Sequence, residues 1–343
     1  MIFESKMKIS ASIYSNNDRS LEILIQDLDK YNIDMFHVDF NDKKIEFNKI
    51  EEDIKEIRRI SNKPIDLHII SDNPNKYENF IIENEIEFVT YQLENIKDKL
   101  EFPNSVKTQF GIAITSDTEV SKFENYKNNC DFILLMTTTP GESGGKFNKI
   151  NFKKIRDFKN TYPSKKVHID GGVNDEIAFI LRIHGVKSVV SGSYLVNGDI
   201  AKSLLELKSS VSSSQIKVSE FMLNRNESPI VSENSKIDEI LSTIEKYDLG
   251  FTCVENRKKE LIGIISMADI RKSLINNIEA FSTFKAEDMI NKNPIIIKEG
   301  DSINNMLKTI QNHNFLISFI PVTNEVMKLV GLVTFFNLIK SES

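Results

Sequence analysis

Short apolar runs alternate with amphipathic stretches eight times along the first two-thirds of this chain of 343 residues. The apolar runs have the length and composition of β-strands, and the stretches between them space apolar residues three and four positions apart, as surface helices do. We expect strands at residues 8–14, 35–40, 65–70, 88–92, 110–114, 132–136, 167–170 and 188–191. Eight such alternations within roughly 200 residues favour a closed (β/α)8 barrel over an open sheet.

A serine-rich segment separates this pattern from a different one. Five serines fall within residues 209–214, and a cluster of this kind is typical of a linker. We therefore predict a barrel over residues 1–208, a linker over residues 209–217 and a smaller domain over residues 218–343. The total length also suits a barrel with a second domain of about a hundred residues.

The smaller domain repeats one sequence pattern. Ser228-Pro-Ile-Val is matched by Asn293-Pro-Ile-Ile, and Leu261-Ile-Gly-Ile-Ile-Ser is matched by Leu329-Val-Gly-Leu-Val-Thr. The two matches keep nearly the same separation, so one supersecondary unit is duplicated, over about residues 218–277 and 284–343. These residues resemble a tandem pair of CBS domains, which are small α+β modules that dock face to face.

The resemblance to CBS domains implies that this domain makes the chain a homo-oligomer, binds an adenine nucleotide, or does both. Ser266 and Asp269 match the hydroxyl and the carboxylate that contact a ribose in that family. In the second repeat Thr334 keeps the hydroxyl, but Asn337 replaces the carboxylate. We therefore expect one nucleotide site rather than two, and dimerisation without a nucleotide is the alternative.

Polar side chains stand at the carboxyl ends of the predicted barrel strands. His37 and Asp39 lie two residues apart in one strand and so point the same way. His68 ends the next strand, and Asp170 reaches the mouth of the barrel from the opposite wall, whereas His168 lies one layer deeper and is expected to be structural. Each of the first four alone fits a core histidine or a helix-capping aspartate, but together they predict one divalent-metal site. Such mixed ligands suit zinc, iron or manganese better than calcium or magnesium.

Three glycine-containing loops follow predicted strands on the same rim. Barrels of this kind commonly bind a phosphate with backbone N–H groups of the loops after strands seven and eight, where glycine lets the chain approach closely. Tight turns without a ligand are the alternative, most of all at Gly141. The candidate phosphate-binding residues are Gly141, Gly144, Gly171, Gly172, Gly192 and Ser193.

Six motifs of the barrel region match the sequence pattern of one known family. They are Ser10-Ala-Ser-Ile-Tyr-Ser, Phe36-His-Val-Asp, Ile65-Asp-Leu-His, Met136-Thr-Thr-Thr-Pro-Gly, His168-Ile-Asp-Gly-Gly and Val189-Val-Ser-Gly-Ser. These motifs resemble the ribulose-phosphate 3-epimerase family along nearly the whole barrel. The resemblance implies that His37, Asp39, His68 and Asp170 bind the metal. It also implies that Asp39 and Asp170 are the acid–base pair and that Ser12 and Met136 lie near the substrate.

The chemistry that the residues suggest agrees with an isomerase of this type. Inverting a carbon next to a ketone requires a proton to leave one face and return to the other, so two carboxylates are needed across the substrate. A metal that bridges the ketone and a neighbouring hydroxyl would stabilise the enediolate between the two steps. The family resemblance implies ribulose 5-phosphate, converted to xylulose 5-phosphate, as the first candidate substrate.

Several wall residues depart from the family pattern. Asn41 and Ile70 stand where the family has methionines, and Gln92 stands where it has a histidine. Glu142 and Ser143 replace a phenylalanine and a glycine in the phosphate loop. None of these changes removes a metal ligand or a catalytic carboxylate. They leave two alternatives: an enzyme for another sugar phosphate, such as one used in surface-carbohydrate synthesis, or a barrel that has lost turnover and acts as a scaffold or sensor.

Charge, hydropathy and cysteine content argue against a nucleic-acid-binding, membrane-spanning or secreted protein. The 50 acidic and 44 basic residues are interleaved, which leaves no basic face for a nucleic acid. No apolar run approaches the roughly 18 residues of a membrane span, and the first residues lack the pattern of a secretory signal. Cys130 and Cys253 fall in different predicted domains, so we expect no disulfide and a cytoplasmic protein.

Overall fold

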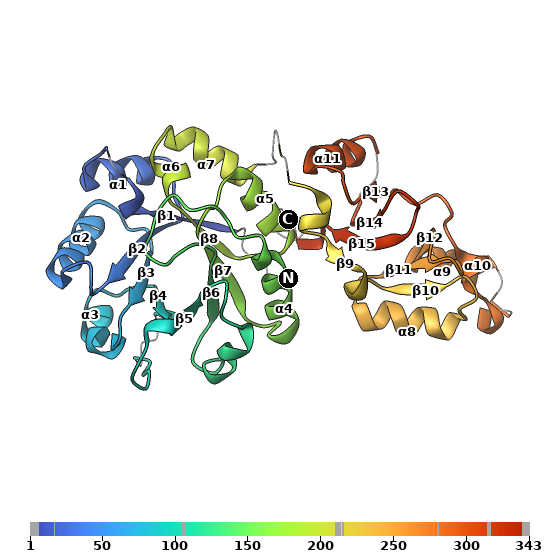
Figure 1. The fold of residues 1–343 in the computed structure, drawn as a ribbon, viewed down its shortest axis with the longest axis horizontal. Helices are drawn as coiled ribbons and strands as arrows, with labels where there is room; N and C mark the ends of the chain where they lie inside the picture. Colours follow the sequence, from blue (N-terminus) through green and yellow to red (C-terminus); the bar gives the residue numbers. More distant parts are fainter. Residues whose placement is uncertain are drawn as a thin grey trace. The chain divides into compact units, whose positions relative to one another are not determined.

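The computed structural model describes residues 7–16, 18–103, 107–209, 214, 216–276, 278–279, 281–313 and 317–337. By its contacts the chain divides into two compact units, one of Met1–Val211 with Asn337–Ser343 and one of Ser212–Phe336. Most of the predicted linker, residues 210–213 and 215, lies outside the described residues. Figure 1 shows the ribbon of both units with their elements labelled.

The first unit is the closed parallel barrel that the alternation predicts. Its strands pair in chain order, and the eighth pairs with the first. The first predicted strand ends two residues early, because Ile13–Ser15 form a 3-10 turn, and the others agree within one residue. The strands are β1 (Lys8–Ser12), β2 (Met35–Asn41), β3 (Ile65–Ile70), β4 (Phe88–Gln92), β5 (Gln109–Ile114), β6 (Phe132–Met136), β7 (Lys166–Asp170) and β8 (Ser188–Ser191).

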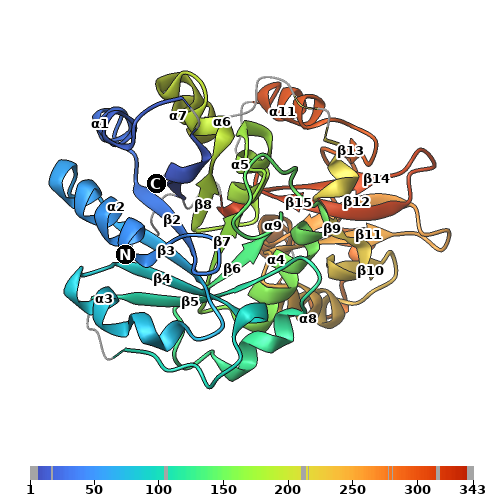
Figure 2. The ribbon, with the colours of Figure 1, turned by 60° about the vertical axis from the view of Figure 1, so that its left-hand side comes forward.

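Helices cover the outside of the barrel, as Figure 2 shows. In α2, Ile50, Ile54 and Ile57 lie three and four positions apart and all are buried. The connections after β4 and β5 differ from the prediction, because their described residues hold the 3-10 turns η3 (Leu93–Asn95) and η4 (Val120–Asn125) instead of α-helices. Asn, Asp and Ser are frequent there and favour turns over helix interiors. The helices are α1 (Leu21–Lys30), α2 (Phe47–Ile60), α3 (Glu78–Glu83), α4 (Ile150–Thr161), α5 (Asp175–Ile183), α6 (Ser193–Val196) and α7 (Ile200–Lys208).

The barrel interior is filled by layers of side chains from alternate strands. The lowest layer is apolar, since Met35, Phe88 and Phe132 pack against one another. Gly111 on β5 leaves room for this packing, because a Cβ at Gly111 would overlap the Phe132 ring. His168 is buried above, with its ring stacked on Phe132 at a centroid distance of 4.0 Å, and burial lowers its pKa to about 4. His168 is therefore a core residue.

The second unit is the predicted α+β module, and it contains one arrangement twice. β11 pairs with β12 starting from Phe251 and Ser266, and β14 pairs with β15 in the same way starting from Phe319 and Thr334. The sheets have the orders β10-β11-β12 and β13-β14-β15-β9. The elements are β9 (Leu223–Asn224), β10 (Ile230–Ser232), α8 (Ile237–Tyr247), β11 (Phe251–Glu255), β12 (Leu261–Ser266), α9 (Met267–Asn276), α10 (Ala286–Met289), β13 (Ile297–Lys298), α11 (Ile303–Gln311), β14 (Phe319–Thr323) and β15 (Leu329–Thr334).

A segment near the start of each repeat pairs with the sheet of the other repeat. β9, near the start of the first repeat, pairs with β15 of the second, whereas Asn291, near the start of the second repeat, forms a bridge with Ile264 in β12 of the first. The repeated glycine of each motif permits this crossing. A Cβ at Gly331 would overlap Leu223 O, and a Cβ at Gly263 would overlap Asn291 O. The two repeats are therefore interlocked.

Two further expectations concern the whole chain. Among the described residues, no helix combines the length and hydropathy that crossing a membrane requires. Cys130 and Cys253 are buried free thiols that lie in different units. Burial raises the pKa of Cys130 to about 12, which keeps this thiol protonated and unreactive.

Candidate metal centre at the barrel mouth

Four side chains that the sequence singles out lie together at the carboxyl ends of β2, β3 and β7. One nitrogen or oxygen atom from each of His37, Asp39, His68 and Asp170 lies within 4.8 Å of the others. His37 Nε2 is 3.3 Å from Asp39 Oδ1 and 3.7 Å from Asp170 Oδ2, and His68 Nδ1 is 3.0 Å from Asp39 Oδ1. Both imidazoles are fully buried, whereas both carboxylates are partly exposed.

Strand register explains this convergence. Asp39 on β2 is the register partner of His68 on β3, so the two side chains leave the sheet at the same height. His37 and Asp39 share the interior face, because side chains alternate along a strand. Phe36 and Val38 occupy the other face and are buried. Alternation and register together bring the candidate ligands to one place.

The second ring nitrogen of His37 is held by a buried carboxylate. His37 Nδ1 lies 2.9 Å from Asp66 Oδ2, and the same oxygen accepts a hydrogen bond from Ser10 Oγ at 3.0 Å. In the neutral imidazole, which is the form that binds a metal, an acceptor beside Nδ1 keeps the proton there and directs the Nε2 lone pair at Asp39 and Asp170. Asp66 and Ser10 are not among the residues predicted from sequence, although the spacing of Asp66 and His68 indicates that both face the interior.

His68 is held through its other nitrogen. His68 Nε2 donates to Gln92 Oε1 at 2.8 Å, so Nδ1 is the nitrogen that faces Asp39. Gln92 is buried at the end of β4. From sequence Gln92 is only a changed wall residue, but the structure makes it the hydrogen-bond partner of a candidate ligand.

The two carboxylates of the site have opposite pKa shifts. Burial raises the pKa of Asp170 to about 6. Burial would also raise the pKa of Asp39, but His37 and His68 hold it well below its usual value. Burial would lower the pKa of His37, yet Asp39 and Asp66 raise it well above its usual value. Carboxylate pairs whose surroundings separate their pKa values can divide acid and base roles.

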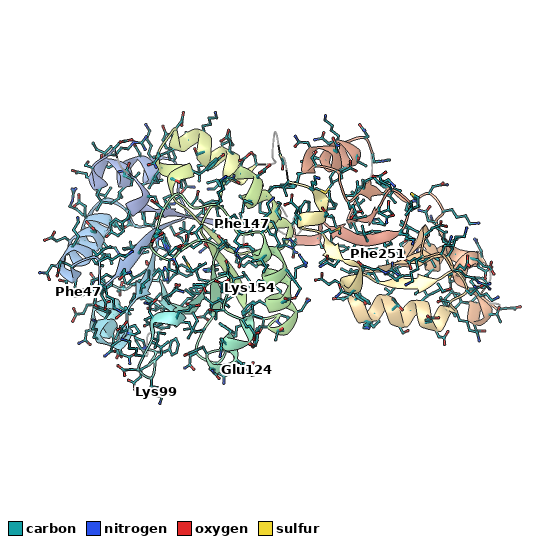
Figure 3. The ribbon with its side chains drawn as sticks, in the orientation of Figure 1. Phe47, Lys99, Glu124, Phe147, Lys154 and Phe251 are labelled. Atoms are coloured by element: carbon teal, nitrogen blue, oxygen red, sulfur yellow. The ribbon has the colours of Figure 1, made fainter. Side chains whose placement is uncertain are left out.

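Two candidate glycines follow β7 in conformations that other residues rarely adopt. Gly171 and Gly172 have φ angles of +112° and +63°. A Cβ at Gly171 would lie 2.8 Å from Thr138 N, and a Cβ at Gly172 would overlap the backbone of Phe147, which Figure 3 labels. The chain after β7 therefore approaches the loop after β6 so closely that only glycine fits.

Gly192 lies against the end of the first strand. A Cβ at Gly192 would overlap Ser15 Oγ and would lie 3.7 Å from Ser12 Cβ. Ser15 Oγ donates a hydrogen bond to Ser12 Oγ at 3.1 Å. Ser193 begins the short helix α6 directly after Gly192. The structure thus brings three candidates, Ser12, Gly192 and Ser193, to the seam where β8 pairs with β1.

The loop after β6 is more open. Gly141 and Gly144 have φ angles of +69° and +82°, and both are exposed. A Cβ at Gly141 would lie 3.3 Å from Ile70 Cδ1, whereas the space around Gly144 is free within 4 Å. Met136, at the end of β6, is buried and is the register partner of Asp170. Gly144 is therefore the candidate with the most open surroundings.

The candidate nucleotide residues stand at the ends of β12 and β15. Ser266 Oγ and Ser266 N both donate to Asp269 Oδ2, at 2.6 and 2.9 Å, and Asp269 N donates to Ser266 Oγ at 3.3 Å. These reciprocal bonds form a capping box at the N-terminus of α9. Thr334, the counterpart of Ser266, is partly buried. The structure brings Ser266 and Asp269 together and gives them a capping role that the sequence-based expectation does not include.

Two clefts occupy matching positions in the second unit. The larger, of about 580 Å³, is lined in part by Arg225, Tyr247 and Val330. The smaller, of about 260 Å³, is lined in part by Lys292 and Ile262, the counterpart of Val330. The three candidate nucleotide residues do not line either of these two clefts.

Comparison with known sequence families divides the chain in the same way. A model of the ribulose-phosphate 3 epimerase family matches residues 8–196. A model of the CBS domain matches residues 218–276 and 286–343.

Curated relatives match the barrel part. The ribulose-phosphate 3-epimerase of Methanocaldococcus jannaschii is 28% identical over 211 residues, which cover 58% of this chain and 88% of the relative. That of Aquifex aeolicus is 30% identical over 165 residues, which cover 46% of this chain and 74% of the relative. Among solved structures, a CBS domain-containing protein of unknown function from Bacillus anthracis is 22% identical, with a TM-score of 0.33, and covers 37% of this chain and 91% of that chain.

Proposed function

The chain belongs to the ribulose-phosphate 3-epimerase family, a family of isomerases, and from this premise we propose that its barrel is a metal-dependent epimerase of a phosphorylated ketose. Ribulose 5-phosphate is the first candidate substrate and xylulose 5-phosphate the product. The observation that carries the proposal is the convergence of His37, Asp39, His68 and Asp170 within 4.8 Å of one another at the barrel mouth.

The donor set fits a divalent transition metal. It offers two imidazole nitrogens and two carboxylate oxygens, which suit zinc, iron or manganese. Each imidazole also has its other nitrogen beside an acceptor, Asp66 for His37 and Gln92 for His68, as is typical of metal-ligating histidines. We therefore assign all four residues as ligands. When bound, such an ion supplies positive charge beside the substrate oxygens.

Asp39 and Asp170 are proposed to move the proton. The low pKa of Asp39 keeps it ionised, which is the form that removes a proton from the substrate carbon. In the metal-free site burial raises the pKa of Asp170, so of the two carboxylates Asp170 is the better suited to return a proton. The two residues stand on β2 and β7, on different walls of the barrel, so that removal and return take place on different faces of the substrate. In the reverse direction they exchange roles.

The phosphate is proposed to lie on the loops after β7 and β8. Side chains at Gly171, Gly172 and Gly192 would overlap their neighbours, so glycine lets the backbone N–H groups of these loops approach an anion. Ser12 lies beside Gly192, and Ser193 follows Gly192 at the start of α6. The full proposed set of substrate-binding residues is Ser12, Met136, Gly141, Gly144, Gly171, Gly172, Gly192 and Ser193.

The second unit is proposed to bind an adenine nucleotide and to assemble the enzyme into a homo-oligomer in the cytosol. Ser266 and Asp269 would bind the ribose, because both capping-box bonds to Asp269 end on Oδ2 and leave Oδ1 outside the capping box. Thr334 would be the weaker counterpart. Met267 and Ile275 on α9 are 47% and 75% exposed, and such apolar surface favours self-association because a second copy would cover it.

A second candidate is an epimerase for a different sugar phosphate. Ile70 Cδ1 would be 3.3 Å from a Cβ at Gly141, so this isoleucine shapes the wall next to the phosphate loop. Glu142 is exposed in the same loop and adds a negative charge there. These two residues change the outer wall and not the metal ligands. The complete acid–base pair disfavours a barrel without turnover.

Deuterium incorporation from heavy water at the inverted carbon would test the proposal. Purified protein would be loaded separately with manganese, iron or zinc and supplied with a panel of ketose phosphates, including ribulose 5-phosphate. We expect exchange and epimerisation with at least one member of the panel. Absence of exchange with every substrate and every metal would contradict the proposal, and exchange with another member alone would identify the second candidate.

A further inference from the structure

A chain of hydrogen bonds runs from His68 to the exposed rim of the barrel. His68 Nε2 donates to Gln92 Oε1 at 2.8 Å, and Gln92 Nε2 donates to Glu94 Oε2 at 2.5 Å. Glu94 follows Gln92 by two residues and lies in η3, directly after β4. The chain therefore links a fully buried imidazole to a carboxylate at the rim.

The other oxygen of Glu94 is held by the loop after β5. Glu94 Oε1 accepts hydrogen bonds from Thr115 N at 2.9 Å, from Thr115 Oγ1 at 3.2 Å and from Thr118 Oγ1. Burial would raise the pKa of Glu94, but the hydrogen bonds from Thr115, Thr118 and Gln92 outweigh burial and lower it. Glu94 is thus an ionised carboxylate that is fixed between two strand ends.

An ionised Glu94 permits one orientation of the Gln92 amide. A side-chain amide has one acceptor oxygen and one donor nitrogen. If the amide turned over, its oxygen would face Glu94 Oε2 across 2.5 Å, and two acceptors repel at that separation. Its nitrogen would then face His68 Nε2 and could not accept the proton of that nitrogen. Glu94 therefore keeps the amide oxygen of Gln92 directed at His68.

An acceptor beside Nε2 in turn decides which nitrogen of His68 carries the proton. The oxygen of Gln92 can only accept, so in the neutral imidazole, which is the form that binds a metal, the proton stays on Nε2 and the lone pair is on Nδ1. Nδ1 is the nitrogen that lies 3.0 Å from Asp39 Oδ1. At His37 the carboxylate of Asp66 fixes the position of the proton directly. At His68 the carboxylate of Glu94 fixes it through the amide of Gln92.

We propose that Glu94 and Gln92 are positioning residues that fix the tautomer of His68 and so present its Nδ1 lone pair to the metal. The inference rests on the proposed metal site and deepens it. The family resemblance implies a histidine at position 92. The amide found here does not titrate, so Glu94 alone sets the polarity of the hydrogen bond to His68.

Zinc binding by the full-length chain tests this inference. Zinc is diamagnetic, so ¹⁵N NMR of histidine-labelled protein reports which imidazole nitrogen carries the proton, and competition with a chelator measures zinc affinity. Glu94→Gln and Gln92→Leu break the chain at different links. Glu124→Gln is the matched control, because Glu124, labelled in Figure 3, accepts a hydrogen bond from Tyr162 Oη at 3.0 Å and takes no part in the chain.

The expected results separate positioning from folding. Both test variants should lower zinc affinity by about 10–100-fold and change the ¹⁵N signals of His68, whereas the control should match the wild type. Without zinc, Glu94→Gln should melt close to the wild type, whereas Gln92→Leu should melt at a lower temperature because the buried Nε2–H of His68 loses its acceptor. Unchanged zinc affinity in both test variants would overturn the inference, and so would a lower melting temperature with unchanged His68 signals. A wild-type chain that binds no zinc would instead overturn the metal site on which the inference rests.

Discussion

Asp66 allows charge and hydrogen bonding to be separated beneath the metal centre. The hydrogen bonds from His37 Nδ1 and Ser10 Oγ both end on Asp66 Oδ2. Asparagine at position 66 can place its amide oxygen there and keep both bonds, whereas leucine can keep neither. Asp66→Asn therefore removes the charge alone, and Asp66→Leu removes the charge together with the acceptor.

The two variants should differ in stability. Leucine leaves the His37 Nδ1–H and Ser10 O–H groups buried without an acceptor, and each such group costs about 1–3 kcal/mol. The unfolding free energy of the metal-free protein should therefore fall by about 2–6 kcal/mol in Asp66→Leu. In Asp66→Asn both bonds become neutral and weaker, but a buried charge is also removed, so these two effects offset each other in part. Asp66→Leu should thus be the less stable variant by about 2 kcal/mol or more.

Metal affinity should respond to the charge. Loss of a carboxylate behind a metal-ligating histidine weakens metal binding by about 10–100-fold, which corresponds to about 1.4–2.7 kcal/mol. Chemical denaturation of the chelator-treated chain and competition for zinc would measure the two quantities, with His37→Ala as the reference for a lost ligand. The reasoning would be refuted if Asp66→Leu were as stable as Asp66→Asn, or if Asp66→Asn lost zinc as completely as His37→Ala.

Four other predictions concern the catalytic acid and the second unit. Asp170→Asn removes the proton carrier of one face, so substrate-proton exchange with deuterated water should fall by a factor of about 10²–10⁴; undiminished exchange would contradict the two-carboxylate mechanism. Burial raises the pKa of Asp170 from 3.8 to about 6 in the folded metal-free protein. Protonated Asp170 therefore contributes its full stabilisation below pH 3.8, the pKa of the unfolded chain, and this stabilisation is lost as the pH rises through about 6, the pKa of the folded protein. The stability of the wild type relative to Asp170→Asn should decrease between pH 4 and 6, and a constant difference in denaturation midpoints would argue against the shift. Gly331→Ala should destabilise the second unit by about 1–3 kcal/mol, because a Cβ would overlap Leu223 O, whereas Gly300→Ala, in open space, should not; equal melting temperatures would be inconsistent with the interlocked sheets. Asp269→Ala should abolish the rise in melting temperature that AMP, ADP or ATP gives the wild type. The nucleotide-free variant should also be less stable by about 1 kcal/mol, because α9 loses its cap. A rise in melting temperature that is retained in the variant would exclude the ribose contact.

Patterns along single strands are enough to predict the barrel and the four side chains at its mouth. Period-two alternation places His37 and Asp39 on one face, and the same rule applies to Asp66 and His68 in the next strand. Asp66 could therefore have been added to the predicted site. The hydrogen bond between Asp66 and His37 could not have been predicted, because it depends on the register of β2 and β3, which neither strand specifies alone.

Contacts between distant segments account for what the sequence does not predict. Gln92 and Glu94 can be placed at the rim from sequence, but Thr115, which fixes Glu94, comes from the loop after another strand. The pairing of β9 with β15 joins segments about a hundred positions apart in the chain. The repeated glycines Gly263 and Gly331 signal a close approach there without identifying its partner.

The crossing of β9 and Asn291 between the repeats limits how the second unit can fold while the chain is being synthesised. During synthesis β12 emerges before Asn291 exists to cover its edge, and β9 waits for β15, the last strand of the described chain. Open sheet edges can pair with other chains and so promote aggregation. In the nascent second unit these edges are covered only when both repeats have left the ribosome. A chain cut between the repeats would keep two unmatched edges. Each repeat therefore depends on the other for the partner of its crossing segment.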